Sequence, residues 1–295
     1  MINFNKFYKL FNIISICLVV ISILLLFFKG LNFGVDFKGG TLIELRANDK
    51  KINVTSLRDS FSNMDLGDIN IKKFGNESDF LIKIEKKDTS ADEVETIKKD
   101  LVKVIGSSFN FRRVENVGPK VSSELLKSGI IAIALSLAAM LFYIWIRFEW
   151  QFSLGAILAL FHDVVITLGF FSLLGLEINL SIVAAVLTIV GYSMNDTVVI
   201  YDRVRENLRK YSDIKILELT NISINETLSR TIITSVTTLL ALISIFIFGG
   251  EILKGFSFAM ILGVVFGTYS SIYISNPVLV KLRVSQKTIL KEDTE

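Results

Sequence analysis

The chain has 295 residues, of which 51% are hydrophobic and only 21% are charged, and its mean hydropathy is +0.55. This composition excludes an ordinary water-soluble globular protein and predicts that most of the chain lies in a membrane. The net charge of +3 says little by itself, because topology depends on how lysine and arginine are distributed among the loops. The single cysteine, Cys17, excludes an intrachain disulfide.

Six apolar runs are each long enough to cross a bilayer as a helix. We interpret the first as a retained anchor, because it exceeds the apolar core of a signal peptide and no small-x-small cleavage site follows it. The runs cover residues 11–28, 129–146, 152–174, 178–200, 231–248 and 256–280. These runs divide the chain into four parts. An N-terminal segment with the first span covers 1–29, and a domain outside the spans covers 30–128. The other five spans, with a loop at 201–230, cover 129–280, and a C-terminal tail covers 281–295.

In the short loops and the terminal segments, lysine and arginine gather on one side of the predicted helices. An even number of spans places both termini on the same side, and the turns on the other side hold a single lysine, Lys254. The positive-inside rule therefore predicts that both termini and the loop 201–230 are cytoplasmic and that 30–128 lies outside. The residues that carry this charge are Lys6, Lys9, Arg203, Arg205, Arg209, Lys210, Lys215, Arg230, Lys281, Arg283, Lys287 and Lys291.

The segment 30–128 has the pattern of a water-exposed α+β domain. Strands are predicted at 41–46, 68–74, 79–86 and 109–115, and helices at 55–61 and 90–105. The order βαββαβ is the split-βαβ, ferredoxin-like arrangement. The predicted fold class is thus a polytopic α-helical membrane protein with six transmembrane helices and one extracytoplasmic α+β domain. Its lysines indicate a solvated surface, and no nucleic acid is expected as a partner.

Gly39 and Gly40 precede the first strand of this domain. They are either a hinge between the anchor and the domain or a plain β-turn, and the sequence does not separate the two.

Asp196 lies inside the fourth apolar run, where a charged carboxylate costs about 2.5–3.5 kcal/mol at the bilayer centre. Such a residue is usually a proton or ion site, or one half of an ion pair. Arg230 stands at the start of the fifth run, and in an antiparallel hairpin it would lie at a similar depth. The pair is a candidate proton-coupling site; the alternatives are a static ion pair and, for Arg230, an arginine that extends to the headgroups.

Other polar residues in the spans are candidate supporting groups. Thr234, Thr237 and Thr238 share a helical face with Arg230, which is either a hydrated seam or ordinary helix-to-helix hydrogen bonding. Asn195 is expected to hydrogen-bond either Asp196 or a neighbouring helix.

His162 and Asp163 fall near the middle of the third span, so neither is expected to face lipid. Asp163 is either a second element of a proton path or a packing anchor. His162, the only histidine, is more often a structural donor, and its isolation argues against a metal cluster. Small residues recur four apart in the sixth span, at Gly263, Gly267 and Ser271; this ridge indicates helix packing and is a candidate face toward a partner subunit.

Several short motifs occur in a fixed order along residues 10–284. They are Gly34-Val35-Asp36-Phe37-Lys38-Gly39-Gly40, Val117-Gly118-Pro119, Arg147-Phe148-Glu149-Trp150, His162-Asp163, Tyr192-Ser193-Met194-Asn195-Asp196-Thr197 with Asp202-Arg203, Leu228-Ser229-Arg230-Thr231, and Gly267-Thr268-Tyr269-Ser270-Ser271 with Pro277. In this order they resemble the SecD/SecF family of bacterial protein secretion, and Asn195-Asp196 has the form of its SecF-like chains.

The resemblance implies an accessory subunit of the Sec translocase, a transport component and not an enzyme, in the bacterial inner membrane. It implies that the proton-motive force promotes polypeptide translocation and release on the far side, with Asp196 as the proton carrier and Arg230 as an essential cation. The implied partners are SecD, the SecYEG channel, YajC, an unfolded translocating polypeptide and lipid. No cofactor other than coupling protons is expected, and the sequence contains no Gly-x-x-x-x-Gly-Lys-Ser/Thr phosphate loop.

Two other classes share some of these features. A small-molecule antiporter would use the same buried Asp and Arg, but the exporters that this family resembles have two six-span halves. An intramembrane hydrolase would need a nucleophile–base set or paired carboxylates, and Asp163 and Asp196 could in principle form such a pair across two helices, but the familiar Gly-x-Gly-Asp and His-Glu-x-x-His signatures are absent.

Overall fold

The computed structural model describes residues 1–48, 57–58, 69–74, 76–84, 95, 99, 102–103, 109–211 and 214–290. The chain divides into two compact units. The helical unit comprises Met1–Asn32, Ala132–Leu176 and Ser181–Glu295, and the sheet unit comprises Phe33–Ile131 and Glu177–Leu180.

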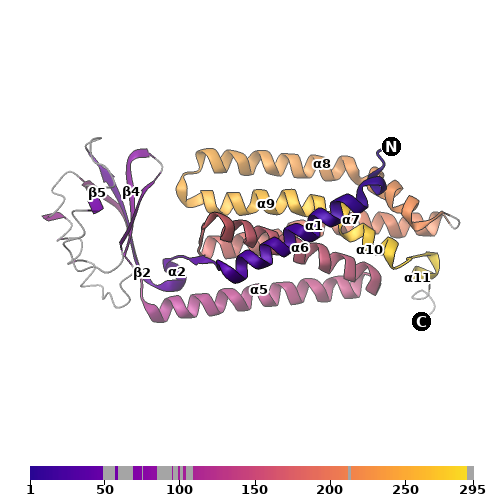
Figure 1. Cartoon of the computed structure of the whole chain (residues 1–295), viewed down its shortest axis with the longest axis horizontal. Helices are drawn as coiled ribbons and strands as arrows, with labels where there is room; N and C mark the ends of the chain where they lie inside the picture. Colours follow the sequence, from indigo (N-terminus) through magenta and orange to yellow (C-terminus); the bar gives the residue numbers. More distant parts are fainter. Residues whose placement is uncertain are drawn as a thin grey trace. The chain divides into compact units, whose positions relative to one another are not determined.

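Six helices in the described part of the chain are long and apolar enough to cross a membrane, which confirms the six predicted spans (Figure 1). A short 3₁₀ turn, η1 (Phe4–Phe7), leads into the first helix. The long helices are α1 (Tyr8–Phe28), α5 (Pro119–Arg147), α6 (Trp150–Leu174), α7 (Leu180–Lys210), α8 (Ile216–Phe248) and α9 (Glu251–Tyr273), and the last of these is followed by α10 (Ser275–Lys281) and α11 (Gln286–Leu290). Proline at the first position of α5 suits a helix start, because that position needs no backbone N–H donor.

The interior of the helical unit is formed mainly by α6 and α7. The ring of Tyr201 is fully buried against Phe152, and its hydroxyl donates to the carbonyl of Ser275 at 3.1 Å. Gly155 makes this contact possible, because a Cβ at that position would collide with the Tyr201 hydroxyl. By contrast, α1, α5 and α8 expose many large apolar side chains, as expected for surfaces that lie in lipid or against another subunit.

The segment 201–230, predicted as a loop, is mostly helical, because α7 continues to Lys210 and α8 begins at Ile216. Polar contacts hold the two helices together beyond their apolar runs. Glu226 of α8 accepts from Arg203 Nε at 2.7 Å and from Asn207 Nδ2 at 2.7 Å, both of which belong to α7. The loop prediction was wrong because a search for apolar runs finds only the membrane-embedded part of a helix.

The sixth span is interrupted near Ile274, where α9 ends and α10 begins. Pro277 has no N–H to donate to the carbonyl four residues before it. Side chains stabilise the break: Ser275 Oγ and Asn276 Nδ2 each donate to the carbonyl of Ser271 at 2.7 Å.

In the sheet unit, four strands form an antiparallel sheet in the order β3-β4-β2-β5. This is the strand order of a split-βαβ domain, as predicted. The strands are β2 (Gly40–Ala47), β3 (Ile69–Phe74), β4 (Asn76–Ile84) and β5 (Phe109–Val117). The helices predicted at 55–61 and 90–105 lie largely outside the described residues, although those described within them are helical: 57–58, 95, 99 and 102–103.

One face of this sheet is apolar and the other is charged, because neighbouring side chains alternate between faces. Ile43 pairs with Ile82 and Leu45 with Phe80 on the buried face, where Leu57 also packs. On the opposite face Arg46 makes a two-point contact with Asp79, at 2.6 and 2.8 Å; Lys83 contacts Glu177 there at 2.9 Å.

Gly39 and Gly40 form a corner between the short helix α2 (Val35–Lys38) and β2. Their φ angles are +80° and +125°, a region that favours glycine over every residue with a Cβ. Near this corner the two-residue strands β1 (Asn32–Phe33) and β6 (Glu177–Ile178) form a second sheet, extended by the Gly34 N–H donating to the Ile178 carbonyl at 2.8 Å.

Candidate functional site in the helical unit

Asp196 lies on the inward face of α7 and is only 3% exposed. Its Oδ2 accepts one long hydrogen bond, 3.5 Å, from Thr268 Oγ1 of α9. The Thr268 hydroxyl is in turn 2.7 Å from Ser235 Oγ of α8. Because Thr268 has a single hydroxyl proton, a Thr268 that donates to Asp196 must accept from Ser235. A chain of hydroxyls therefore connects the carboxylate on α7 with α9 and α8.

Arg230 lies on the outer face of α8. Its side chain is exposed, whereas Thr231 and Ser235, one helical turn apart, point inward and are buried. No direct ion pair joins Arg230 to Asp196, although both residues are described, so the contact that the sequence suggested is not formed in this state.

The supporting residues near this pair make local contacts. Thr234, Thr237 and Thr238 donate to carbonyls of their own helix, at 2.8 to 3.0 Å, and none of them has a hydrogen bond to another helix in the described part of the chain. Asn195 is exposed, and its side chain has no hydrogen bond to the described part of the chain. Neither expectation for Asn195 is met within this chain, which leaves its amide on an outer face of α7.

Asp163 is fully buried, and its side chain brings three helices together. Oδ2 accepts from Ser193 Oγ of α7 at 2.5 Å and from Ser270 Oγ of α9 at 2.7 Å. Oδ1 is 2.8 Å from Nδ1 of the neighbouring His162 on α6. Asp163 and Asp196 thus have separate hydrogen-bond partners, an arrangement unlike the shared pair of carboxylates that a hydrolase would need.

The glycine ridge of α9 packs against α7 of the same chain. A Cβ at Gly263 would overlap all three outer carbons of Ile189, and one at Gly267 would lie 3.1 Å from the Ser193 Cβ. Ser271 Oγ is 2.8 Å from Thr197 Oγ1. The ridge is a helix-packing surface, and because α7 occupies it, it is not the face toward a partner.

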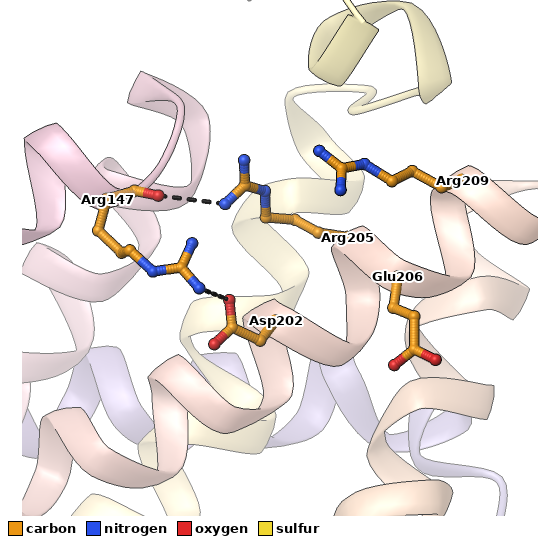
Figure 2. Close-up of a pocket in the computed structure, with 5 residues that line it drawn as sticks. All are labelled: Arg147, Asp202, Arg205, Glu206 and Arg209. Carbon is orange, nitrogen blue, oxygen red and sulfur yellow. Dashed lines mark hydrogen bonds and ion pairs between the residues drawn. The ribbon is translucent and has the colours of Figure 1, made fainter. Parts of the chain in front are cut away.

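A charged pocket of about 360 Å³ lies at the last residue of α5 and the part of α7 that follows its apolar run. Figure 2 shows its lining residues as sticks: Arg147, Asp202, Arg205, Glu206 and Arg209. Arg147 contacts Asp202 at 2.7 Å, and Arg205 donates to the Arg147 carbonyl at 3.1 Å. Arg205 also contacts the buried Glu149 at 3.1 Å. These contacts fasten the Arg147-Phe148-Glu149-Trp150 turn to α7.

Sequence reasoning missed the hydroxyl groups that complete both clusters: Ser193, Ser235, Thr268 and Ser270. Each is one of many serines and threonines in the apolar runs, and which of them meet Asp163 or Asp196 depends on how the helices pack. Among the described residues, no group of three or more His, Cys, Asp or Glu side chains is arranged to hold a metal ion.

Two solved structures that are similar to this chain are structures of SecDF. The chain matches the crystal structure of SecDF from Thermus thermophilus, described as a translocon-associated membrane protein, with a TM-score of 0.85 and 35% sequence identity over 95% of its residues. It spans only 38% of that longer chain. A second SecDF structure, in a super-membrane-facing form, matches with a TM-score of 0.70 and 34% identity, covering 99% of this chain and 40% of the other.

Sequence comparisons give the same result. The chain is 46% identical to the protein translocase subunit SecF of Rickettsia bellii over 94% of its length and 92% of the relative, and 45% identical to that of Calditerrivibrio nitroreducens over 95% and 93%. The family model for the SecD/SecF C-terminal region matches residues 97–285, and the SecD/SecF GG motif matches residues 24–50, which include Gly39 and Gly40. The chain therefore belongs to the SecD/SecF family of protein-export membrane proteins.

Proposed function

We propose that this protein is a SecF-type transport subunit of the bacterial Sec export system, not an enzyme, and that it uses the proton-motive force to promote polypeptide translocation and release. Its relatives are named protein translocase subunits, and it spans most of their length. The proposed partners are SecD, the SecYEG channel, YajC and an unfolded polypeptide in transit. The location is the inner membrane, with both termini in the cytoplasm.

The observation that carries the proton-coupling proposal is that Asp196 is buried, with one long hydrogen bond and no lysine or arginine paired with it among the described residues. An ionised carboxylate in an apolar interior is costly, so protonation is the simplest way to stabilise Asp196 while Arg230 is not paired with it. The hydroxyl chain can serve either state, since an ionised Asp196 accepts from Thr268 and a protonated Asp196 can donate to it. Loading and unloading one proton would therefore change how α7 contacts α8 and α9.

The energy available matches such a change. One charge that crosses a potential of 100 mV releases about 2.3 kcal/mol, which is enough to shift a two-state helix packing by more than tenfold. In the second packing Arg230 would approach the ionised Asp196. Protons are then the coupling ion, and no other cofactor is needed.

The SecD partnership is supported by polar and small residues on the outside of the helical unit. An exposed arginine at the start of an apolar run must reach the headgroups or be covered by protein. Asn195 extends an exposed stripe of α7 that also contains Ala184, Thr188 and Gly191. A Cβ built on Gly191 would meet no atom within 4 Å from the rest of the described chain, its own helix backbone aside. A stripe of this kind lets a second helix approach closely. We assign it to SecD, because the matched SecDF chain has room for a second half.

The partner face is tested by Gly191→Leu, with Ala138→Leu on the exposed side of α5 as the matched control. Both place a leucine on the exposed side of a membrane helix, and the Gly191 change adds one carbon more than the Ala138 change. Gly191→Leu should reduce copurification with SecD, and Ala138→Leu should leave it unchanged. If the Gly191→Leu protein copurifies with SecD as well as the parental protein does, α7 is not part of the interface.

The topology is tested by labelling single cysteines in a Cys17→Ser background. A membrane-impermeant thiol reagent added to intact cells with a permeabilised outer membrane should label Ser78→Cys and not Ser285→Cys. The reverse pattern would place the sheet unit in the cytoplasm.

The coupling proposal is tested by Asp196→Asn in cells whose only SecF is this chain. Asparagine has nearly the same shape and keeps a hydrogen-bond acceptor, so abundance and SecD copurification should stay near parental while gradient-dependent secretion is lost. Asp202→Asn is the control: Asp202 is on the same helix but is exposed and paired with Arg147, and its replacement should leave secretion intact. An Asp196→Asn protein that still responds to the proton gradient would refute Asp196 as the carrier.

A further inference from the structure

The cluster around Asp163 is built differently from the one around Asp196. Three donors converge on its carboxylate at 2.5 to 2.8 Å, whereas Asp196 has one at 3.5 Å. Two of those donors, Ser193 and Ser270, are hydroxyls that can stabilise an ionised carboxylate without neutralising it. Neither residue of the pair His162 and Asp163 contacts a lysine or arginine side chain in the described part of the chain.

His162 is the third donor, and one of its ring nitrogens has no partner. The side chain is 3% exposed, Nδ1 faces Asp163, and Nε2 is buried without a hydrogen bond to any described residue. A neutral imidazole carries one N–H. If that proton is on Nδ1, where it bonds Asp163, then Nε2 presents a lone pair to an apolar interior, at a cost of about 1–3 kcal/mol.

We propose that His162 and Asp163 together form a second proton-binding site, distinct from Asp196, which takes up its proton at Nε2 of His162. With one proton the pair is a neutral imidazole beside a carboxylate and carries a charge of −1. A proton delivered by water adds to the Nε2 lone pair and gives an imidazolium beside a carboxylate, so the net charge becomes zero. The reverse step returns the proton to water. In a low-dielectric interior the neutral pair is the less costly state.

The aromatic side chains around His162 suit an imidazolium. The ring of Tyr269 stacks on it with centroids 5.8 Å apart, and the ring of Phe266, 6.2 Å away, is inclined to it by 72°. Aromatic faces attract cations. The Tyr269 hydroxyl is held at 2.7 Å from Ser15 Oγ of α1, so α1, α6 and α9 all contribute to the surroundings of the ring. Of the other ionisable groups, Tyr269 is in direct contact with the ring, and Asp196 follows Ser193 by three residues on α7.

The two carboxylates share the boundary between α7 and α9. Ser193 and Asp196 lie one turn apart on α7, and Thr268 and Ser270 are two residues apart on α9. A shift of these helices that alters the Thr268 contact with Asp196 also moves the two serines that bond Asp163. The use of this second site in transport rests on the proposed proton coupling at Asp196, but the existence of the site does not.

A packing role alone predicts a histidine that stays in one protonation state, so the test is a direct titration. His162 is the only histidine, and therefore protein labelled with ¹⁵N-histidine gives a single imidazole in nuclear magnetic resonance spectra. In bilayers, that signal should change from neutral to imidazolium as the pH is lowered across the range in which the protein stays folded. An imidazole that remains neutral throughout would overturn the proposal.

Two variants identify the carboxylate partner. Asp163→Asn removes the negative charge beside the ring, so half-protonation should require at least about a tenfold higher proton concentration. Ser270→Ala removes one donor from the carboxylate and keeps the pair; Asp163 then attracts the proton more strongly, and half-protonation should occur at a higher pH. If His162 is half-protonated at the parental pH in both variants, Asp163 is not its partner and the proposed pair is refuted. If Asp163→Asn does not fold, the result for Ser270→Ala decides by itself.

The same spectra of Asp196→Asn separate this inference from the proposed function. A His162 titration that persists when gradient-dependent secretion is lost supports two sites. A titration that vanishes with Asp196→Asn would show that the proton belongs to Asp196 and would overturn the second site.

Discussion

Close packing of α9 on α7 predicts a large difference between two glycine substitutions. In Gly263→Ala, the new Cβ would lie 2.7 Å from Ile189 Cδ1 and 2.9 Å from Cγ2, and closer still to Cγ1. Rotating the isoleucine about its Cα–Cβ bond exchanges one γ carbon for another, so no rotamer removes the overlap. Relief requires the helices to separate, and overpacking of this kind costs about 1–3 kcal/mol.

Gly191→Ala is the matched control, because its new Cβ would meet no described atom within 4 Å beyond the local backbone of its own helix. Both changes bring the same gain in intrinsic helix propensity, about 1 kcal/mol, which cancels in the comparison. Denaturation of the purified protein in mixed micelles should therefore give a free energy of unfolding about 1–3 kcal/mol lower for Gly263→Ala than for Gly191→Ala. Equal stabilities would show that α9 does not pack on α7 at Gly263.

Three further substitutions have distinct expected effects. Asn207→Ala should lower the free energy of unfolding by about 1–3 kcal/mol, because the buried amide donates to Ser223 and Glu226 and its loss leaves them without that donor. Arg147→Ala removes a half-exposed ion pair and should lower the free energy of unfolding by no more than about 1 kcal/mol in the same denaturation assay. A larger decrease would show that the pocket in Figure 2 stabilises the fold more than a half-exposed ion pair is expected to. Gly40→Ala forces an L-residue to a φ of +125° and should destabilise the sheet unit by about 1–3 kcal/mol. Proteolysis of that unit should then be faster than in the parental protein. An unchanged rate of proteolysis would contradict a strained corner at Gly40.

The sequence predicted what depends on long patterns. Six apolar runs identify six helices because spanning a bilayer demands an uninterrupted apolar length, and alternation identified the four strands because the sheet has one buried face. Helix ends were predicted poorly. The extension of α7 and α8 past their apolar runs depends on pairs such as Arg203 with Glu226, which are distant in sequence and leave no periodic signal.

For a similar reason, the sequence predicted only part of the candidate site. Asp196 and Asp163 stand out because a carboxylate in an apolar run is rare. Their partners Thr268, Ser193 and Ser270 do not stand out, since hydroxyl residues are common in membrane helices and their roles depend on which faces meet. The same limit applies to the ridge at Gly263 and Gly267: the sequence indicates close approach by a helix but not which helix approaches.

The strengths of the two clusters differ in a way that suits different roles. Side-chain hydrogen bonds between membrane helices average about 0.6 kcal/mol, so the contacts of Asp196 with Thr268, Thr268 with Ser235 and Thr197 with Ser271 together contribute about 2 kcal/mol. That is close to the roughly 2.3 kcal/mol released by one proton crossing 100 mV, which means that a single proton can reorganise this boundary. Asp163 is joined to other helices by two short contacts, with Ser193 of α7 at 2.5 Å and Ser270 of α9 at 2.7 Å, whereas the Asp196 contact with Thr268 is 3.5 Å long. Because a hydrogen bond weakens as it lengthens, the contact of Asp196 is expected to break first when the boundary moves.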